Sequence, residues 1–574
     1  MPCTLFTQKQ EYLKYYLDFS IKSRTFATIT VIIKIINILT TKSMMNKTKM
    51  LMTPTIVSLM LAGVLFCSCS DNAGAMDDPA PEVATIVLGD DAINGERVTG
   101  IPNGIYDLTF NVKGDQDSYR VYSVDASGQS LQSCITTPMN ADTWTRAMMP
   151  AVHITDGTIQ LKGTPLDGAI GITSNFSAIR LVQRTDEVVT PIRGGDVSQL
   201  TKLENNSAKF YDQDGKEGDC LEILKNGGMN MARLRLFVEP GASFSTDSTD
   251  VNNKRYYRLP QYYQGEEDIM NLAKRVKAMG LDIELTFNYS DYWADVSHQE
   301  IPASWHRNWK EEGIDSLAME QLLMDSLYSY TSRIMKRMVA QGTAPDMVSI
   351  GNETMNGILF PFASGDKPLA MARFFNAASK AIREACPTAK VLIHLNADYS
   401  KYTWFIGIMK QYAVDYDIIG MSYYPFWAAE SDYKSAEDIV GFAESLYNTY
   451  GKKILFLETG FSWNPTTPEG TGGQISHNGI YDKLYKGTYG VMTKEAQTHY
   501  IIELTQAINQ SKDHCILGYL YWDPIYLDRE NCGWAEEKIG EGEWKMADNV
   551  TSNSTIFDFN GKALPVFDAI KYNK

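Results

Sequence analysis

The fold is decided by the stretch PDMVSIGNE at residues 345–353, a short apolar run that ends on an amide and a carboxylate. A strand that is buried on both faces of a parallel sheet reads as such a run, and nothing in it requires a terminal glutamate. In a (β/α)8 barrel, however, the side chains at the carboxyl ends of the strands point into the active-site mouth. The stretch therefore predicts a barrel strand and makes Glu353 a candidate catalytic acid.

A second segment, KILFLETG at residues 453–460, repeats this design and places Glu458 105 residues after Glu353 (458 minus 353). Glycoside hydrolysis needs two carboxyl groups, because one protonates the leaving oxygen while the other attacks the sugar or activates water. The alternative is that each glutamate is an ordinary strand-end residue that faces solvent or a lysine. The pair favours a glycoside hydrolase.

From about residue 188 onward, strand-like and helix-like segments alternate, which favours a parallel sheet. The helical patterns include residues 267–279, 317–341, 368–385, 436–450 and 494–510. The eight strand candidates are residues 193–197, 230–237, 282–288, 347–353, 391–396, 418–424, 454–459 and 516–523. Eight strands predict one α/β domain, a (β/α)8 TIM barrel over residues 188–574, in which Glu353 ends strand four and Glu458 strand seven.

Residues 83–187 show a different sequence pattern. Apolar and polar residues alternate in short runs, and Gly, Asn and Asp separate these runs. Tyr106, Leu108 and Phe110 form one such period-2 set, which predicts a small all-β sandwich-like domain before the barrel. Such a module either binds sugar or acts as a spacer. Its candidate stacking residues are Tyr119, Tyr122 and Trp144.

The N-terminal residues resemble a bacterial lipoprotein leader. Residues 44–69 contain lysines, then an apolar run at 55–66, then Cys69 after Ser68, which predicts a signal peptide with Cys69 as the lipidated residue. Residues 1–43 are then an upstream extension, which a misplaced start codon would explain. Residues 70–82 are then a linker. A membrane anchor at residues 29–39 is the weaker alternative, because Lys34 interrupts it. We expect a lipoprotein at the outer-membrane surface of the cell envelope.

Composition excludes several classes of function. The chain has 574 residues, too many for one core, and a net charge of −16, which is the wrong sign for a nucleic-acid binder. Its 8 cysteines form no Cys-x-x-Cys pair, and its 7 histidines form no His-Glu-x-x-His motif, so no metal or other cofactor is predicted. Aromatic residues make up 11% of the chain, and flat rings suit the apolar faces of sugars.

Several motifs narrow the barrel to one family. They are GGDVS at 194–198, KFYDQDG at 209–215, RLRL at 233–236, YSDYWAD at 289–295, IGNETMNG at 350–357 and YWDP at 521–524. In this order they resemble the arabinogalactan endo-β-1,4-galactanases of glycoside hydrolase family 53. The resemblance covers residues 190–570 and does not extend to residues 1–187.

The resemblance implies a catalytic role for five residues. Glu353 would be the acid/base and Glu458 the nucleophile, while Asn352 would hold the sugar 2-hydroxyl. Arg235 would be the cation that keeps the nucleophile ionised, although Arg233 has the same parity along the strand and stays an alternative. Tyr423 would donate a hydrogen bond to Glu458.

The resemblance also implies a set of substrate-binding residues, of which Asn288 stands where the family usually has histidine. The loop 464–490 has only two acidic residues, Glu469 and Asp482, so the calcium that some relatives bind after strand seven is not supported. The predicted substrate-binding residues are Asp196, Asn288, Asp291, Trp293, Asn396, Asp398, Tyr424, Trp427 and Trp522.

We therefore expect a monomeric enzyme that hydrolyses internal β-1,4 bonds of galactan with retention of configuration. Its partners would be the polysaccharide and, through the lipid, a membrane, with no nucleic acid. One alternative is another retaining glycanase, such as a mannanase or xylanase. A second is a non-catalytic surface lipoprotein that binds glycan on a degenerate barrel.

Overall fold

The structure is a computed structural model that describes eleven segments of the chain. They are residues 85–88, 96–113, 120–126, 129–135, 144–165, 175–184, 191–245, 255–306, 315–424, 435–470 and 492–572. The predicted extension, signal peptide, linker and Cys69 lie outside these segments, as does Trp427. Among the helices of the described segments, none combines the length and the apolar character that crossing a membrane requires.

Eight parallel strands close into a barrel, with a strand order that follows the chain. They are β9 (Ile192–Asp196), β12 (Met231–Leu236), β15 (Asp282–Phe287), β16 (Met347–Ile350), β19 (Lys390–Leu395), β20 (Ile418–Tyr423), β21 (Lys453–Thr459) and β22 (Ile516–Tyr521). Each of the eight predicted strands is confirmed. The main difference is that β16 ends at Ile350, so Glu353 lies in the turn that follows this strand.

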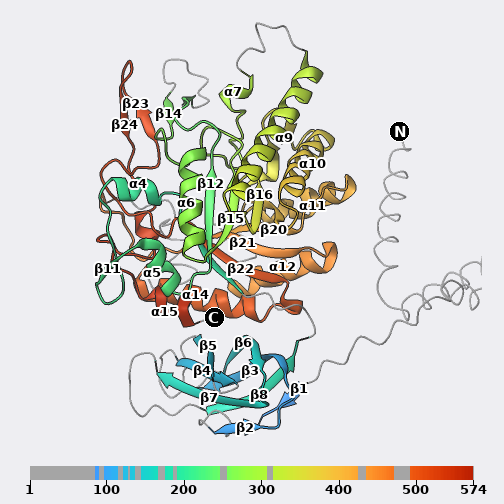
Figure 1. The fold of residues 1–574 in the computed structure, drawn as a ribbon, viewed down its shortest axis with the longest axis vertical. Helices are drawn as coiled ribbons and strands as arrows, with labels where there is room; N and C mark the ends of the chain where they lie inside the picture. Colours follow the sequence, from blue (N-terminus) through green and yellow to red (C-terminus); the bar gives the residue numbers. More distant parts are fainter. Residues whose placement is uncertain are drawn as a thin grey trace, which may run out of the picture. The chain divides into compact units, whose positions relative to one another are not determined.

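Helices surround the barrel on its outer side (Figure 1). They are α4 (Leu200–Asn205), α5 (Cys220–Asn226), α6 (Glu266–Ala278), α7 (Ala303–His306), α9 (Ser316–Ala340), α10 (Pro368–Ala385), α11 (Tyr402–Gln411), α12 (Ala436–Tyr450), α14 (Lys494–Asn509) and α15 (Val566–Tyr572). Their starts follow local chemistry: Asp315 caps α9 through its side chain, and Ser435 with Asp438 forms a capping box on α12. All five predicted helical segments are helices.

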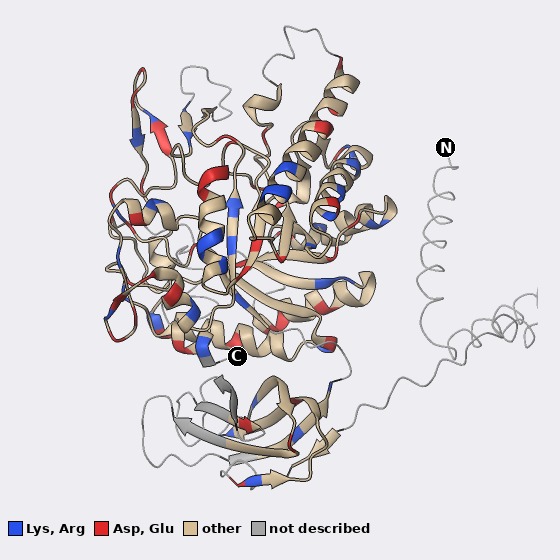
Figure 2. Ribbon diagram, viewed as in Figure 1, with Lys and Arg blue, Asp and Glu red and all other residues tan. Residues whose placement is uncertain are grey.

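Side chains of the barrel strands divide by parity into an outer and an inner set. Along β12, Ala232, Leu234 and Leu236 belong to the large core between barrel and helices. Met231 belongs to a separate apolar cluster, and Arg233 and Arg235 share its parity, so they face the barrel interior. Figure 2 shows basic residues in blue on strand β12, whereas acidic and basic residues are interspersed over the outer helices.

The N-terminal part of the described chain is built from eight antiparallel strands in two four-stranded sheets, ordered β1-β8-β3-β6 and β2-β7-β4-β5. The strands are β1 (Thr85–Val87), β2 (Arg97–Thr99), β3 (Gly104–Lys113), β4 (Arg120–Ala126), β5 (Gln129–Ile135), β6 (Thr145–Ile154), β7 (Thr158–Pro165) and β8 (Asn175–Gln183). Residues of both sheets, such as Leu108 and Leu161, share one apolar cluster. The domain boundary near residue 188 stays a prediction.

Short strands in the loops complete the barrel domain. A four-stranded sheet joins the loops after β12 and β22, in the order β13 (Phe244–Ser245), β14 (Tyr256–Arg258), β23 (Glu536–Lys538) and β24 (Trp544–Met546). Two hairpins are β10 (Phe210–Tyr211) with β11 (Glu217–Gly218) and β17 (Gly357–Ile358) with β18 (Ala363–Ser364). The four-stranded sheet and the β17–β18 hairpin lie in loops that follow the carboxyl ends of barrel strands, so they belong to the barrel mouth, whereas the β10–β11 hairpin lies between α4 and α5.

Candidate active site

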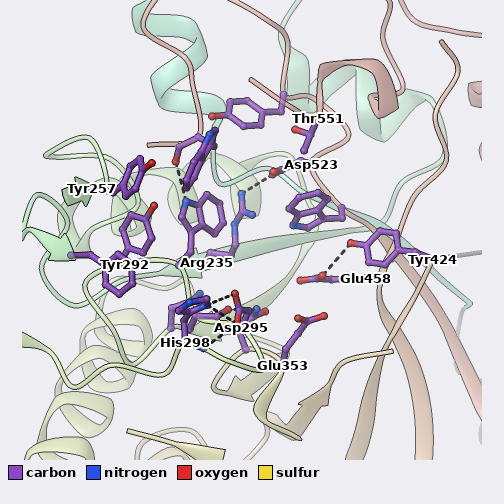
Figure 3. A pocket seen from close by; sticks show the side chains of 18 residues that line it. Arg235, Tyr257, Tyr292, Asp295, His298, Glu353, Tyr424, Glu458, Asp523 and Thr551 are labelled. Carbon is purple, nitrogen blue, oxygen red and sulfur yellow. Dashed lines mark hydrogen bonds and ion pairs between the residues drawn. The ribbon is translucent and has the colours of Figure 1, made fainter. Parts of the chain in front are cut away.

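A cavity of about 360 Å³ opens at the carboxyl ends of the barrel strands. Both predicted catalytic glutamates line it, and Figure 3 shows their side chains facing one another across it. The lining residues are Arg235, Phe244, Tyr257, Asn288, Tyr292, Trp293, Ala294, Asp295, His298, Asn352, Glu353, Tyr424, Glu458, Trp522, Asp523, Tyr526, Trp534 and Thr551.

The two glutamate carboxylates lie close together. One oxygen of Glu353, one oxygen of Glu458 and a ring nitrogen of His394 all lie within 4.8 Å of one another. Retaining glycosidases have carboxyl groups about 5–5.5 Å apart, whereas inverting enzymes separate them by about 6.5–9.5 Å to admit a water. The short separation matches the retaining geometry.

Glu353 reaches the cavity through a tight turn after β16. Gly351 has φ 82° and Glu353 has φ 47°, so both are left-handed. A side chain at position 351 would also meet Thr354 at 2.5 Å, which is why glycine is required there. The left-handed backbone of Glu353 costs about 1–2 kcal/mol, and such strain is typical of functional sites.

The environment of Glu353 favours its protonated form. Burial, followed by the nearby charge of Glu458, raises the pKa of Glu353 to about 8. Ser422 donates a hydrogen bond to Glu353 Oε1 over 2.7 Å, which opposes this shift. A carboxyl group that keeps its proton at neutral pH can act as a general acid.

Glu458 reaches the cavity through an irregularity in β21. Ile454 and Phe456 face the outer core and Leu455 and Leu457 face the barrel interior, so strict alternation would turn Glu458 outward. The pairing of β20 with β21 shifts, however, from Met421 opposite Phe456 to Ser422 opposite Glu458. This bulge turns Glu458 toward the mouth.

The cation that contacts Glu458 is Arg233. Its Nη1 lies 2.5 Å from Glu458 Oε1, its Nη2 donates to Asn352 Oδ1 over 2.6 Å, and its Nε donates to Thr286 over 3.0 Å. Arg233 is fully buried, and its Nε also lies 3.5 Å from Glu284. Arg233 therefore holds Glu458 and the sugar-binding candidate Asn352 in one arrangement.

The prediction that Arg235 contacts Glu458 is therefore wrong. Arg235 lies one inward position further along β12, where its guanidinium pairs with Asp196 at 3.1 Å and Asp523 at 2.6 Å. It also stacks on Trp293, 4.8 Å from the ring centre. Both arginines face the barrel interior, so the sequence pattern could not tell which of them contacts Glu458. The position along β12 decides this, and Arg233 is the residue at the right position.

The predicted contact of Tyr423 with Glu458 is also wrong. Tyr423 has the parity of Met421 and packs in the outer core, with its ring 5.8 Å from that of Phe456. The next residue, Tyr424, donates a hydrogen bond from its hydroxyl to Glu458 Oε2 over 3.1 Å. Tyr424 was predicted as a sugar platform, and its hydroxyl takes the place expected of Tyr423 (Figure 3).

Four predicted substrate-binding residues, Asn288, Trp293, Tyr424 and Trp522, line the cavity. Asn288 is almost fully buried, and its Nδ2 has no hydrogen-bond partner among the described residues. Buried polar groups normally have partners, so the unpartnered amide of Asn288 is an unusual feature of the cavity wall.

The other described candidates do not line the cavity. Asp196 is fully buried and accepts hydrogen bonds from Ser198, so its prediction as a sugar ligand is wrong. Asp291 accepts from the backbone of Ala303, Asp398 pairs with Lys401 at 3.0 Å, and Asn396 lies outside the lining.

The sequence interpretation missed several residues of the site. His394 and Ser422 face inward beneath the glutamates, and their inward parity within strands five and six was the available signal. Glu284 and Asp523 complete the buried ion network. Four aromatic residues of the small loop sheet and its neighbouring loops form one wall of the cavity, and no periodic pattern in the sequence predicts them. They are Phe244, Tyr257, Tyr292 and Trp534.

The comparisons with known proteins agree with this geometry. Residues 192–570 match the family model described as Glycosyl hydrolase family 53. The chain is 27% identical over 409 residues to the endo-beta-1,4-galactanase of Bacillus subtilis, covering 66% of this chain and 85% of that relative. It is 32% identical over 286 residues to a probable arabinogalactan endo-beta-1,4-galactanase A of Aspergillus terreus, covering 48% and 73% of the two chains.

A solved structure extends the similarity to three dimensions. The GH53 catalytic domain of Ignisphaera aggregans superposes with a TM-score of 0.55 and 28% sequence identity, covering 68% of this chain and 99% of that domain. The family match spans the whole barrel and contains every strand that carries the site. The chain therefore belongs to glycosyl hydrolase family 53.

Proposed function

We propose that this protein is an endo-β-1,4-galactanase that hydrolyses galactan and type I arabinogalactan with retention of configuration. The observation that carries the proposal is the pair of close carboxylates in opposite environments: Glu458 bound to a buried arginine, and Glu353 held protonated. Environments that separate the protonation states of two carboxyl groups assign the acid and the base. Galactan is the substrate class that the names of the relatives state.

In the first step, Glu458 attacks the anomeric carbon while Glu353 gives its proton to the leaving glycosidic oxygen. Arg233 and Tyr424 contact the two oxygens of Glu458 and fix the orientation of its carboxyl group. Asn352, whose amide is oriented by Arg233, lines the same cavity as both glutamates and would hold the sugar 2-hydroxyl. The product is a galactosyl ester on Glu458.

In the second step, Glu353 takes a proton from water, which attacks the ester. Formation of the ester removes the charge of Glu458, and this charge is one of the causes that raise the pKa of Glu353. The pKa of Glu353 therefore falls once the ester has formed. The same residue thus acts first as an acid and then as a base.

An assay on galactan, arabinogalactan, mannan and xylan tests the proposed function and its alternatives. We expect reducing ends to appear from β-1,4-galactan with an early fall in viscosity, as internal cleavage requires, and little product from mannan or xylan. Faster hydrolysis of mannan or xylan would favour the other retaining glycanases. Tight galactan binding without any product would favour a non-catalytic binding protein.

The pH dependence follows from the pKa of Glu353. The first step needs the protonated acid, so activity is present below this pKa and lost as the pH rises through it. We expect kcat/KM for galactan to fall above about pH 8, the pKa given to Glu353 by burial and by Glu458. A kcat/KM profile from pH 4 to 10 measures this, and a profile still rising at pH 10 would contradict it.

We infer that the reaction uses no metal, because side chains supply both the acid and the nucleophile. In the loop after β21, Glu469 forms a hydrogen bond with Asp528, and burial followed by Glu469 raises the pKa of Asp528 to about 7. Two carboxyl groups that share a proton do not need a cation between them. We expect EDTA-treated enzyme to keep its activity, and a loss restored by calcium would contradict this.

We further propose that the protein is a monomeric surface lipoprotein. The support is the leader sequence, in which Cys69 follows a small residue and an apolar run. A lipidated Cys69 would keep the catalyst at the cell envelope, where polysaccharide arrives from outside. We expect Cys69→Ala to move the protein from the membrane to the soluble fraction, and an unchanged fractionation would contradict this.

A further inference from the structure

A buried histidine and a buried serine connect to both residues of the Asn352-Glu353 pair. His394 Nε2 lies 2.9 Å from Ser422 Oγ, which lies 2.7 Å from Glu353 Oε1. The other ring nitrogen, Nδ1, lies 3.1 Å from Asn352 Oδ1 and 3.3 Å from the backbone nitrogen of Glu353. Neither His394 nor Ser422 is exposed to solvent, so their polar atoms depend on hydrogen bonds within the protein.

The direction of this hydrogen-bond chain follows from the groups that can act only as donor or only as acceptor. Asn352 Oδ1 already accepts from Arg233, and Asn352 Nδ2 donates to the carbonyl of Ala294 over 2.8 Å. The backbone N–H of Glu353 can only donate, and it points at His394 Nδ1. If Nδ1 carried a proton, this N–H would face another donor, which is costly in a buried place. Nδ1 is therefore the acceptor.

The proton of His394 then lies on Nε2. Burial and Arg233 hold the pKa of His394 well below its usual range, so the ring stays neutral. The Nε2–H donates to Ser422 Oγ, and the serine proton is left for Glu353 Oε1. In this arrangement every polar hydrogen of the network has an acceptor, whereas the 3.1 Å contact between His394 Nδ1 and Asn352 Oδ1 joins two acceptors and is not a hydrogen bond.

We propose that Ser422 and His394 are positioning residues that confine the catalytic proton of Glu353 to Oε2, because Oε1 always receives the serine hydrogen. The inference rests on the proposed function, in which Glu353 is the acid/base. The proton leaves Oε2 for the glycosidic oxygen in the first step, and a water proton returns to Oε2 in the second. Throughout the cycle, His394 and Ser422 keep their own protons.

The proposal makes a specific kinetic prediction. Without the Ser422 hydroxyl, the proton of Glu353 is shared between two oxygens and the carboxyl group loses its anchor. We expect Ser422→Ala to lower kcat about tenfold on galacto-oligosaccharides, whose leaving group needs protonation, as part of the about 10²–10⁴-fold that a general acid supplies. An aryl galactobioside with a nitrophenolate leaving group needs little protonation, and its first step should slow less than twofold.

The fall of kcat/KM at alkaline pH, the alkaline limb of the pH profile, gives a second readout. Ser422 donates to the ionised form of Glu353, so its loss should move this limb upward by about one pH unit. Ser422→Thr keeps the hydroxyl and should restore both measurements. Ser379→Ala is the matched control, because Ser379 is a buried serine that donates to Asp415 over 3.2 Å outside the cavity. The charged and titratable groups that face Glu353 are Arg233, Asp295, His394, Tyr402, Tyr424 and Glu458.

Nitrogen-15 NMR of the histidine-labelled wild type tests the chain without any variant. With signals assigned by their loss in His394→Phe, we expect a neutral His394 protonated on Nε2 from pH 5 to 9. Protonation on Nδ1, an imidazolium at pH 7, or equal slowing of both substrates in Ser422→Ala would overturn the proposal. The NMR result does not depend on activity, so a protein inactive on all galactosides would refute the proposed function separately.

Discussion

Replacement of Glu458 by alanine is expected to lower kcat on galactan by about 10⁴-fold or more, the scale of loss when a nucleophile is removed. The same change at Glu353 should cost about 10²–10⁴-fold, the contribution of a general acid. Both losses follow from the double displacement, in which each residue has one half of the reaction. Equal loss in both variants, however, would not tell the two roles apart.

Added azide distinguishes them through the stereochemistry of the product. In Glu458→Ala, azide occupies the space of the missing carboxylate and attacks an aryl β-galactobioside from that side, giving an α-galactosyl azide. In Glu353→Ala, Glu458 still forms its ester and azide attacks from the opposite side, giving a β-galactosyl azide. NMR of the products reads the anomer directly, and exchanged outcomes would reverse the two assignments. Glu458→Gln, which keeps the size of the side chain, checks that inactivity is not unfolding.

The barrel was readable from the sequence because each strand is a short apolar run between amphipathic helices. Runs such as residues 391–396 and 418–424 are typical of strands that are buried on both faces of a parallel sheet. The catalytic pair was readable for a related reason, since a carboxylate at the end of an apolar strand is costly unless it has a function. Glu353 and Glu458 both meet in the cavity as the sequence predicts.

The contacts around the pair were not readable, because they depend on backbone irregularity and strand depth. The bulge in β21 changes the side of the strand on which the Glu458 side chain lies, and no residue type in the sequence predicts this bulge. With Glu458 turned inward, it lies opposite Ser422 of β20 and accepts a hydrogen bond from Tyr424, the residue after that strand, instead of from Tyr423. The aromatic wall depends on loops after β12 and β22 that pair only in three dimensions, as Tyr257 opposite Glu537 shows.

Arg233→Lys is expected to lower kcat/KM by about 10²–10³-fold, the range for removal of one preorganised donor. The arginine contacts Glu458, Asn352 and Thr286 through three different nitrogens. A lysine keeps the charge but has a single ammonium group, so it cannot orient the nucleophile and the amide together. The burial of poorly paired carboxylates should also lower the free energy of unfolding by about 3 kcal/mol.

Arg235→Lys is the matched control, because Arg235 lies two residues further along the same strand and is equally buried. Its partners are Asp196 and Asp523, and neither Glu353 nor Glu458 is among them. We expect a similar loss of stability but a much smaller loss of kcat/KM, measured by urea unfolding and by initial rates on folded protein. If Arg235→Lys lost as much activity as Arg233→Lys, orientation of Glu458 would not be the function that separates the two arginines. Both arginines face the barrel interior, and the sequence pattern does not distinguish them. The two substitutions therefore test whether the position along β12 decides which arginine orients the nucleophile.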